Sequence, residues 1–294
     1  MGTNIQKSVE KTISCLTMEK MDNRIFNSVG SSRIRMRWLL NYWEEAEEYG
    51  IGKKYDAMIF QKVYWGAMMD KFEGVKILDL CDPDWLENKP VFEFVDKVDA
   101  VTTSTEALAE FVRKMRPKAN VLCIPDRIYL PEATPQKTEH SDQIKKLVWF
   151  GYSSNAHYLT RVYDELIKRE LELTVVSESP IEPSQGYRGK IVLNNVLFNY
   201  NTINKEMIKH DAILLPDPIG DERGKYKSNN KTLQAWSLGM PVIKVPDDLD
   251  TLATKEARVQ ESTMRLQEIK DKWDCRLSVE EYRALIASIQ AKKL

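Results

Sequence analysis

Positive charge gathers around one predicted helix start in the second half of the sequence. The stretch 220–241, GDERGKYKSNNKTLQAWSLGMP, follows an apolar strand pattern and leads into a helical one. Three lysines there surround three short polar residues: Lys225, Lys227 and Lys231 around Ser228, Asn229 and Asn230. Ser228 or Asn229 could cap this helix without any ligand. Lysines near a helix N-terminus oppose the helix dipole by about 0.3–1 kcal/mol each, so their presence favours a bound anion.

A second basic stretch, 28–38 (SVGSSRIRMRW), follows the first predicted strand. Gly30, Ser31 and Ser32 could turn the chain and expose backbone amides to an anion. Four arginines and no acidic residue lie between Arg24 and Arg37. Two interpretations stay open: a solvated basic turn, or a loop that meets phosphates through one of the arginines from 33 to 37.

Carboxylates cluster at 79–85 (DLCDPDW), where another predicted strand ends. One of them could act as a general base toward an acceptor hydroxyl, and Asp82 is the candidate. Asp-Pro is also a common turn starter, and the turn is slightly favoured. Of the three histidines, only His157 lies in a loop that could face a ligand. No metal-binding spacing of His, Cys or Asp occurs, so we expect no metal site.

Short β-rich runs alternate with amphipathic helical stretches along the chain, which predicts parallel sheets covered by helices. Strands are expected at 12–17, 55–60, 75–80, 100–103, 120–124, 146–150, 172–177, 190–193, 212–215 and 241–245. Helices are expected at 37–49, 64–72, 91–97, 104–115, 156–169, 202–209 and 229–238, with two more in the tail that break near 275–278. Ser104 or Thr105 should cap the helix at 104–115.

A polar, proline-bearing stretch, 129–143, interrupts this alternation and is typical of a linker. We therefore predict an N-terminal domain at 1–130, a second domain at 144–250, and C-terminal helices at 251–294 that pack across both. The fold class is α/β, with two Rossmann-like parallel-sheet domains facing a cleft and a helical tail. Ligands of such sheets bind near the carboxyl ends of the strands.

Composition excludes several classes of protein. The chain has 294 residues, 30% of them charged, and a formal net charge of -1, so a surface that grips nucleic acid over its whole extent is not expected. No apolar run approaches the roughly 18 residues of a membrane span. The N-terminus lacks the apolar core of a secretory signal, and the four cysteines are far apart. These features predict a cytoplasmic protein without a membrane span.

The run 227–243, KSNNKTLQAWSLGMPVI, resembles the donor-binding signature of GT-B glycosyltransferases of the retaining, family-four type. The wider order is similar too: DAILLP at 211–216 resembles their strand before that loop, and VWFGYSSN at 148–155 the start of their second domain. DAVTTST at 99–105 and VLCIPD at 121–126 resemble the end of their first domain. The likeness covers most of residues 12–246, and only the 227–243 block is specific.

This resemblance implies that Ser228, Asn229, Asn230 and Lys231 hold a donor diphosphate. Gln234 falls where the family usually has a glutamate bound to the ribose, and an amide lacks that glutamate's charge. The loop at 151–157 lacks the family's basic pair, so either its polar residues or Arg161 would contact the phosphates. The candidate catalytic residues are Lys231, Arg35, Arg37 and Asp82. The candidate donor-binding residues are Ser31, Ser32, Ser153, Ser154, Asn155, Lys227, Ser228, Asn229, Asn230 and Gln234.

The function implied is transfer of a sugar from a nucleoside-diphosphate sugar to an acceptor hydroxyl, with retention and without a metal or other cofactor. The acceptor could be a glycan, another polymer, a protein or modified DNA. Two alternatives stay open: a nucleotide-sugar binding module with weak or no turnover, and a nucleotide-sugar epimerase of the same fold.

Overall fold

The computed structural model describes residues 10–18 and 29–293. The chain divides into two compact units. The first contains Met1–Tyr129, Lys225–Ser228 and Cys275–Leu294, and the second contains Leu130–Gly224 and Asn229–Asp274. Each unit is described by itself.

The first unit is built on a six-stranded sheet in which every pairing is parallel. In spatial order its strands are β2 (Ala46–Glu48), β1 (Ile13–Thr17), β3 (Ala57–Gln61), β4 (Val75–Leu80), β5 (Ala100–Thr103) and β6 (Val121–Cys123). β1, β3 and β5 are buried along their whole length. Strands buried on both faces need helices on both sides, as a parallel sheet usually has.

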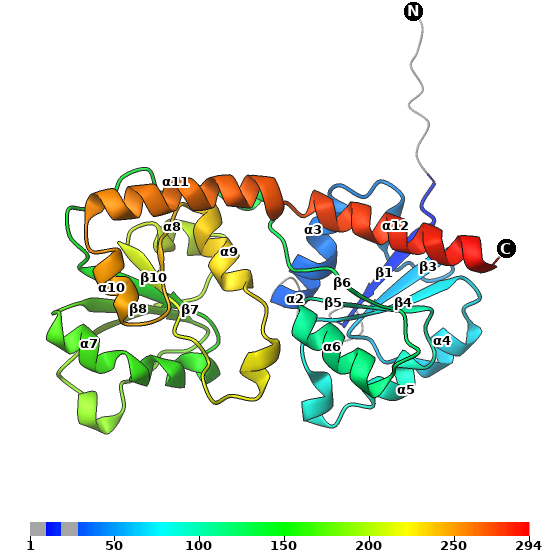
Figure 1. Cartoon of the computed structure of the whole chain (residues 1–294), viewed down its shortest axis with the longest axis horizontal. Coiled ribbons are helices and arrows are strands. Elements are labelled where there is room, and N and C mark those ends of the chain that lie inside the picture. The colour runs from blue at the N-terminus through cyan, green and yellow to red at the C-terminus, as the bar shows by residue number, and fades with distance from the viewer. Residues whose placement is uncertain (1–9, 19–28, 294) are drawn as a thin grey trace, which may run out of the picture. The chain divides into compact units, whose positions relative to one another are not determined.

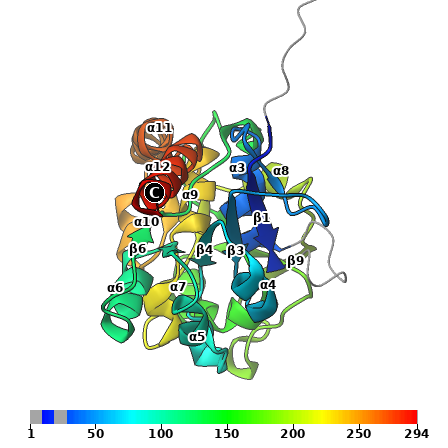
Figure 2. The ribbon, with the colours of Figure 1, turned by 90° about the vertical axis from the view of Figure 1, so that its right-hand side faces the viewer.

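Helices cover both faces of this sheet. Figures 1 and 2 show α4 (Gly66–Lys71), α5 (Val91–Val95) and α6 (Glu106–Met115) on one side, with α3 (Trp38–Leu40) and α12 (Arg276–Lys293) on the other. The short helix α2 (Gly30–Ser32) and a π-helical turn, Arg33–Arg37, run directly into α3. The Thr105 hydroxyl accepts a hydrogen bond from the Leu108 amide, so the predicted cap of α6 is confirmed.

The second unit contains a five-stranded sheet, also parallel throughout. In spatial order its strands are β11 (Val242–Ile243), β10 (Ala212–Leu214), β7 (Lys146–Phe150), β8 (Glu172–Ser177) and β9 (Val192–Leu197). β7 is central and alternates between two apolar clusters. Leu147 and Trp149 belong to one cluster, and Val148 and Phe150 to the other.

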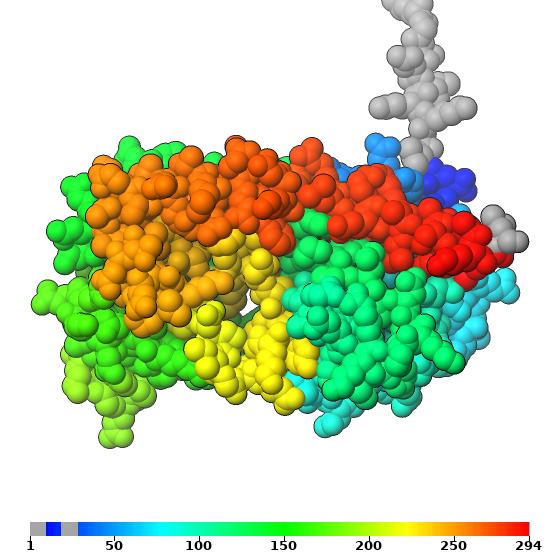
Figure 3. Space-filling model, in the orientation of Figure 1, coloured from blue at the N-terminus to red at the C-terminus, as the bar shows by residue number. Residues whose placement is uncertain are grey.

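The helices of the second unit are α7 (Tyr163–Lys168), α8 (Ile203–Met207), α9 (Asn230–Ser237), α10 (Asp247–Thr251) and α11 (Lys255–Lys272), together with the 3₁₀ helix Ser153–Arg161. α11 packs against α9. In the space-filling view α11, in orange, forms a long stretch of this unit's surface (Figure 3). The predicted fold class of two parallel-sheet domains with a helical tail is confirmed.

Two predicted helices are wrong in part. The segment 37–49 contains only the three-residue α3, followed by a turn and the edge strand β2. β2 forms because Ala46 pairs with Ile13 of β1, and Trp43, just before β2, is fully buried. The segment 156–169 is divided between the 3₁₀ helix and α7. In the described part of the chain, no helix is both long and apolar enough to span a bilayer.

Candidate functional site

The ammonium of Lys231 lies at the carboxyl end of the central strand of the second unit. Lys231 is the second residue of α9, and its Nζ is 5.1 Å from the centroid of the Trp149 ring and 5.7 Å from that of Phe150. Both rings end β7. A cation over an aromatic face is stabilised by about 0.5–2 kcal/mol, which holds the charge in place while leaving it positive. The expected basic helix start therefore places one of its lysines against a strand end.

Gly151 makes this approach possible. It follows β7 directly, and a Cβ at this position would lie 2.3 Å from Lys231 Nζ and 3.0 Å from the Trp149 ring. Any other residue would push the lysine away from the strand end. Gly151 was not among the predicted site residues, although a glycine at the end of a strand can mark a close approach of this kind.

The position of Lys231 coincides with the switch point of the sheet. β7 pairs with β8 on one side and with β10 on the other. After β7 the chain forms β8 and β9 toward one edge of the sheet, and it then returns to form β10 and β11 toward the other. In open parallel sheets, ligands bind outside the carboxyl ends of the strands at this point. Lys231, Gly151 and the first residues of the 3₁₀ helix Ser153–Arg161 all lie there.

The polar residues after β7 make internal contacts. The Ser153 amide donates to both oxygens of Glu178, at 2.9 and 3.1 Å, and its hydroxyl donates to the same carboxylate. These bonds lower the pKa of Glu178. The Ser154 carbonyl contacts His157 Nδ1 at 2.8 Å. The Ser153 amide therefore already faces an anionic group, the carboxylate of Glu178.

Arg161 and Gln234 also have defined positions. Arg161 donates to the carbonyls of Asp217, at 3.1 Å, and Ile219, and lies over the Tyr158 ring. Gln234 lies three residues after Lys231, on the same face of α9. Its amide nitrogen is 3.4 Å from the Asn204 side-chain oxygen.

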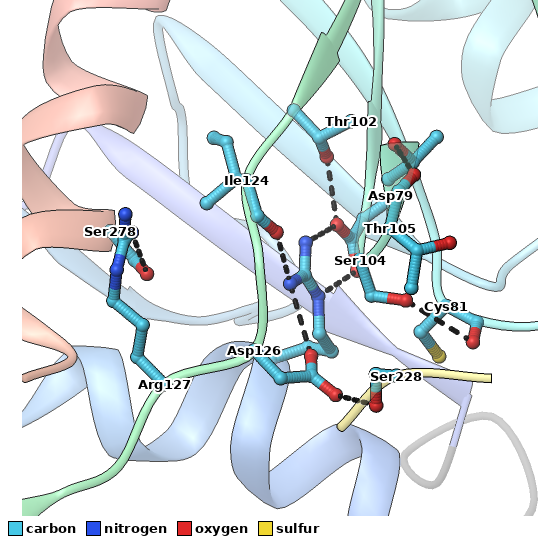
Figure 4. A network of polar contacts seen from close by, with 12 residues as sticks. Asp79, Cys81, Thr102, Ser104, Thr105, Ile124, Asp126, Arg127, Ser228 and Ser278 are labelled. Atoms are coloured by element: carbon cyan, nitrogen blue, oxygen red, sulfur yellow. Dashed lines mark hydrogen bonds and ion pairs between the residues drawn. The ribbon is translucent and has the colours of Figure 1, made fainter. Parts of the chain in front are cut away.

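The residues that precede α9 are distributed between the two units. Asn229 occupies the N-cap position, and its side chain makes no capping hydrogen bond. The side-chain nitrogen of Asn230 is buried and has no hydrogen-bond partner among the described residues. Lys227 and Ser228 belong to the first unit, where the Ser228 hydroxyl donates to the Asp126 carboxylate at 2.6 Å (Figure 4).

Arg35 lies inside the first unit with 3% of its surface exposed. Its guanidinium bonds to Asp79 at 2.6 and 3.1 Å, to the Ile124 carbonyl at 2.6 Å and to Asp126 at 3.2 Å. Burial alone would lower the pKa of Arg35, but Asp79 and Asp126 raise it, so the group stays charged. Burial raises the pKa of Asp126, and Arg35 opposes that effect. This arrangement favours a structural role for Arg35 over the expected role at a diphosphate.

The other candidates in the first unit also have partners within it. Arg37 pairs with Glu48 at 2.9 Å, and Asp82 pairs with Lys62 at 2.5 Å. The Ser32 hydroxyl donates to Gln61 at 3.0 Å, and the Ser31 hydroxyl faces the sulfur of Met18. Arg24 and Ser28 lie outside the described residues. The roles expected for these side chains stay predictions.

Comparison with known proteins identifies the architecture. No family model matches the sequence, and no curated protein matches it. Among solved structures, Anabaena HepE in complex with UDP is similar over 94% of this chain and 100% of its own, with a TM-score of 0.65 and 10% identity. A mutant of S. aureus TarM, in complex with fondaparinux, α-GlcNAc-glycerol and UDP, is similar over 78% of this chain with a TM-score of 0.58 and 11% identity. The chain has the GT-B fold.

The extent of these likenesses differs between the neighbours. The chain spans 55% of the length of TarM. A DNA-modifying β-glucosyltransferase is similar over 96% of this chain and 98% of its own, with a TM-score of 0.50 and 12% identity. The likenesses to HepE and to the β-glucosyltransferase thus extend over most of this chain, and at 10–12% identity they show the fold alone. Within the described residues, no cluster of three or more His, Cys, Asp and Glu side chains could hold a metal ion.

Proposed function

We propose that this protein is a glycosyltransferase that uses a nucleoside-diphosphate sugar. The observation that supports this proposal most is the position of Lys231. Its ammonium lies against Trp149, beside Gly151, at the switch point of the second sheet. The GT-B fold supports the proposal, as do the UDP complexes of HepE and TarM. The donor diphosphate would contact Lys231 and the amides at the start of α9, with Gln234 toward the ribose.

Lys231 would act by electrostatics. As the bond between sugar and diphosphate breaks, negative charge develops on the leaving phosphate, and a fixed cation in a partly desolvated site stabilises that charge. Lys231 is held against two rings, which reduces the reorganisation needed during the reaction. We propose retention of configuration and no requirement for a metal, with a glycan, polymer, protein or modified DNA as acceptor.

Donor hydrolysis tests this proposal without knowledge of the acceptor. The protein is incubated with UDP-, GDP- and ADP-sugars, with and without EDTA, and release of the nucleoside diphosphate is measured. We expect slow hydrolysis of one donor class that EDTA does not change. Lys231→Ala should weaken binding of the matching nucleoside diphosphate about tenfold or more, because it removes a charge-assisted contact.

Lys190→Ala provides the matched control, because Lys190 is an exposed lysine of the same unit away from β7. It should leave the affinity unchanged. Equal affinity of the wild-type protein and the Lys231→Ala variant would show that the diphosphate binds elsewhere.

A binding module without turnover is the second candidate. It is favoured by one observation: Arg35, Arg37 and Asp82, which were expected to assist catalysis, all form ion pairs inside the first unit. The same assay separates the two candidates. Thermal stabilisation by a nucleotide sugar without release of its diphosphate would favour the binding module, and hydrogen exchange at the sugar C2 would favour an epimerase.

A further inference from the structure

A four-residue segment of the chain docks on the first unit although the residues on both sides of it belong to the second. Lys225–Ser228, here called the strap, is preceded by Gly224 and followed by Asn229, both of the second unit. Asn229 is the N-cap of α9, the helix that carries Lys231. The strap therefore joins the first unit directly to the start of the helix at the proposed donor site.

Aromatic contacts anchor the strap. The Tyr226 ring meets the Trp85 ring edge-on, at 5.3 Å between centroids, and the Phe111 ring at 5.8 Å. Trp85 and Phe111 stack on each other at 4.5 Å and both contact Phe92, so Tyr226 joins an existing aromatic cluster. The Thr105 hydroxyl donates to the Tyr226 carbonyl at 3.2 Å. Edge-to-face ring pairs stabilise a contact by about 0.5–1.5 kcal/mol beyond the burial of apolar surface. The Tyr226 ring therefore holds the strap on the first unit.

The second anchor is the hydrogen bond from Ser228 to Asp126. Figure 4 shows the two side chains facing each other at the edge of the network that contains Asp79 and Thr102. Asp126 is buried, and its other oxygen accepts from Arg35. A serine hydroxyl has one proton to donate. While that proton is donated to Asp126, Ser228 cannot donate it to a phosphate.

We propose that the strap and a nucleoside diphosphate compete, so that donor binding at the start of α9 releases Lys225–Ser228 from the first unit. The proposal rests on the proposed function. Two features carry it: the single proton of Ser228, and the negative charge of Asp126, which would repel a phosphate bound to the same hydroxyl. Asp126 is then a positioning residue, because it acts on the donor only through Ser228.

Linkage makes this competition measurable from both sides. If the diphosphate binds better to the undocked protein, it must shift the population toward that state. Conversely, in a variant whose strap is already undocked, binding of the diphosphate no longer costs the free energy of undocking. Its affinity for the diphosphate therefore rises. Docking and binding can therefore be measured separately and must change in opposite directions.

Limited trypsinolysis of the full-length protein measures docking, because Lys225 and Lys227 are exposed trypsin sites within the strap. Cleavage after each lysine is followed by mass spectrometry and divided by the rate in the urea-unfolded chain. Tyr226→Ala should speed cleavage after Lys227 about tenfold, and Asp126→Asn should speed it less. UDP, or whichever of GDP and ADP binds, should speed cleavage after Lys225 in the wild-type protein. Both variants should bind that nucleotide several-fold more tightly.

Tyr42→Ala is the matched control, since Tyr42 is a half-buried tyrosine of the first unit whose ring contacts Tyr129 rather than the strap. It should change neither cleavage nor affinity, and thermal unfolding shows whether each variant is folded. Slower or unchanged cleavage in the presence of a bound nucleotide would overturn the competition and leave the proposed function standing. If no nucleoside diphosphate binds the wild-type protein, the proposed function and the competition both fail, and the ligand-free comparison still shows whether Tyr226 docks the strap.

Discussion

At the scale of single residues, the absence of a side chain at Gly151 determines where the ammonium of Lys231 lies. Gly151 leaves room for Lys231 Nζ at the end of β7, where a Cβ would lie 2.3 Å away. We expect Gly151→Ala to displace the ammonium and to weaken nucleoside-diphosphate binding about tenfold. Isothermal titration calorimetry with the nucleotide found in the donor assay measures the effect.

Gly186→Ala is the control for that substitution. A Cβ at Gly186 would meet nothing within 4 Å, and the residue lies in the same unit. Its affinity should equal that of the wild-type protein. Unchanged affinity in Gly151→Ala, with normal thermal stability, would mean that the position of Lys231 does not determine binding.

The sequence shows why Lys231 is unusual, but it does not show the ion pairs of Arg35. A lysine at a helix N-terminus is locally unfavourable, and that conflict is visible in the sequence alone. The partners of Arg35 are Asp79 and Asp126, which lie 44 and 91 residues away in the chain. Without the pairing of β4, β5 and β6, nothing shows that these carboxylates lie beside the guanidinium. The internal ion pairs of Arg35 were therefore not predictable, and its role at a diphosphate stays a prediction.

At the scale of elements, Ser262 joins α11 to the turn after α9, and a buried histidine supports this contact. The Ser262 hydroxyl on α11 donates to the Gly239 carbonyl at 2.7 Å, so His140 Nε2, 3.2 Å from the same oxygen, must carry its hydrogen and donate. His140 Nδ1 is buried without a partner in the described part of the chain. Burial, with Lys137 and Arg258 nearby and Asp211 opposing, lowers the pKa of His140 to about 4.

This lowered pKa gives the stability of the second unit a pH dependence. The unfolded chain takes up the proton near pH 6.5 and the folded chain only near 4, so the contribution is complete above about 6.5 and is lost as the pH falls toward 4. We expect His140→Gln to lose less unfolding free energy than the wild-type protein between pH 7 and 5, by on the order of 1 kcal/mol after solvent screening. Urea unfolding at both pH values tests this, with the exposed His157→Gln as control. Parallel pH profiles for wild type and His140→Gln would contradict it.

Most strands of the parallel sheets were predictable because buried β-branched runs have few alternatives. β4, β5, β7 and β8 have the predicted bounds. The edge strand β2 was not, because AEE carries no strand pattern and forms only by pairing with β1. Local sequence fixes central strands, whereas edge strands depend on a neighbour that is distant in the sequence.

At the scale of the whole molecule, chain order and structural unit differ. The two tail helices were predicted together, yet α11 belongs to the second unit and α12 to the first. Tyr282 of α12 is fully buried in the first unit, where it donates to Asp79 at 2.8 Å and stacks on Trp43 at 5.6 Å. No local pattern distinguishes the two helices, because both are charged and amphipathic. The place of α12 depends on Asp79 and Trp43, more than 200 residues earlier in the chain, whereas α11 packs against the much nearer α9.

The location of α12 predicts that this helix stabilises the first unit and not the second. A variant that ends at Asp274 lacks Tyr282 and leaves Asp79 with one hydrogen-bond donor fewer in a buried site. Hydrogen exchange followed by mass spectrometry should show lost protection in β4 and β5, with β7 and α9 unchanged. Tyr282→Ala should act in the same direction and cost the first unit about 3 kcal/mol or more, as large-to-small changes in a core do. Equal loss of protection in both sheets would show instead that the two units unfold as one, and unchanged protection in β4 would show that α12 does not support the first sheet.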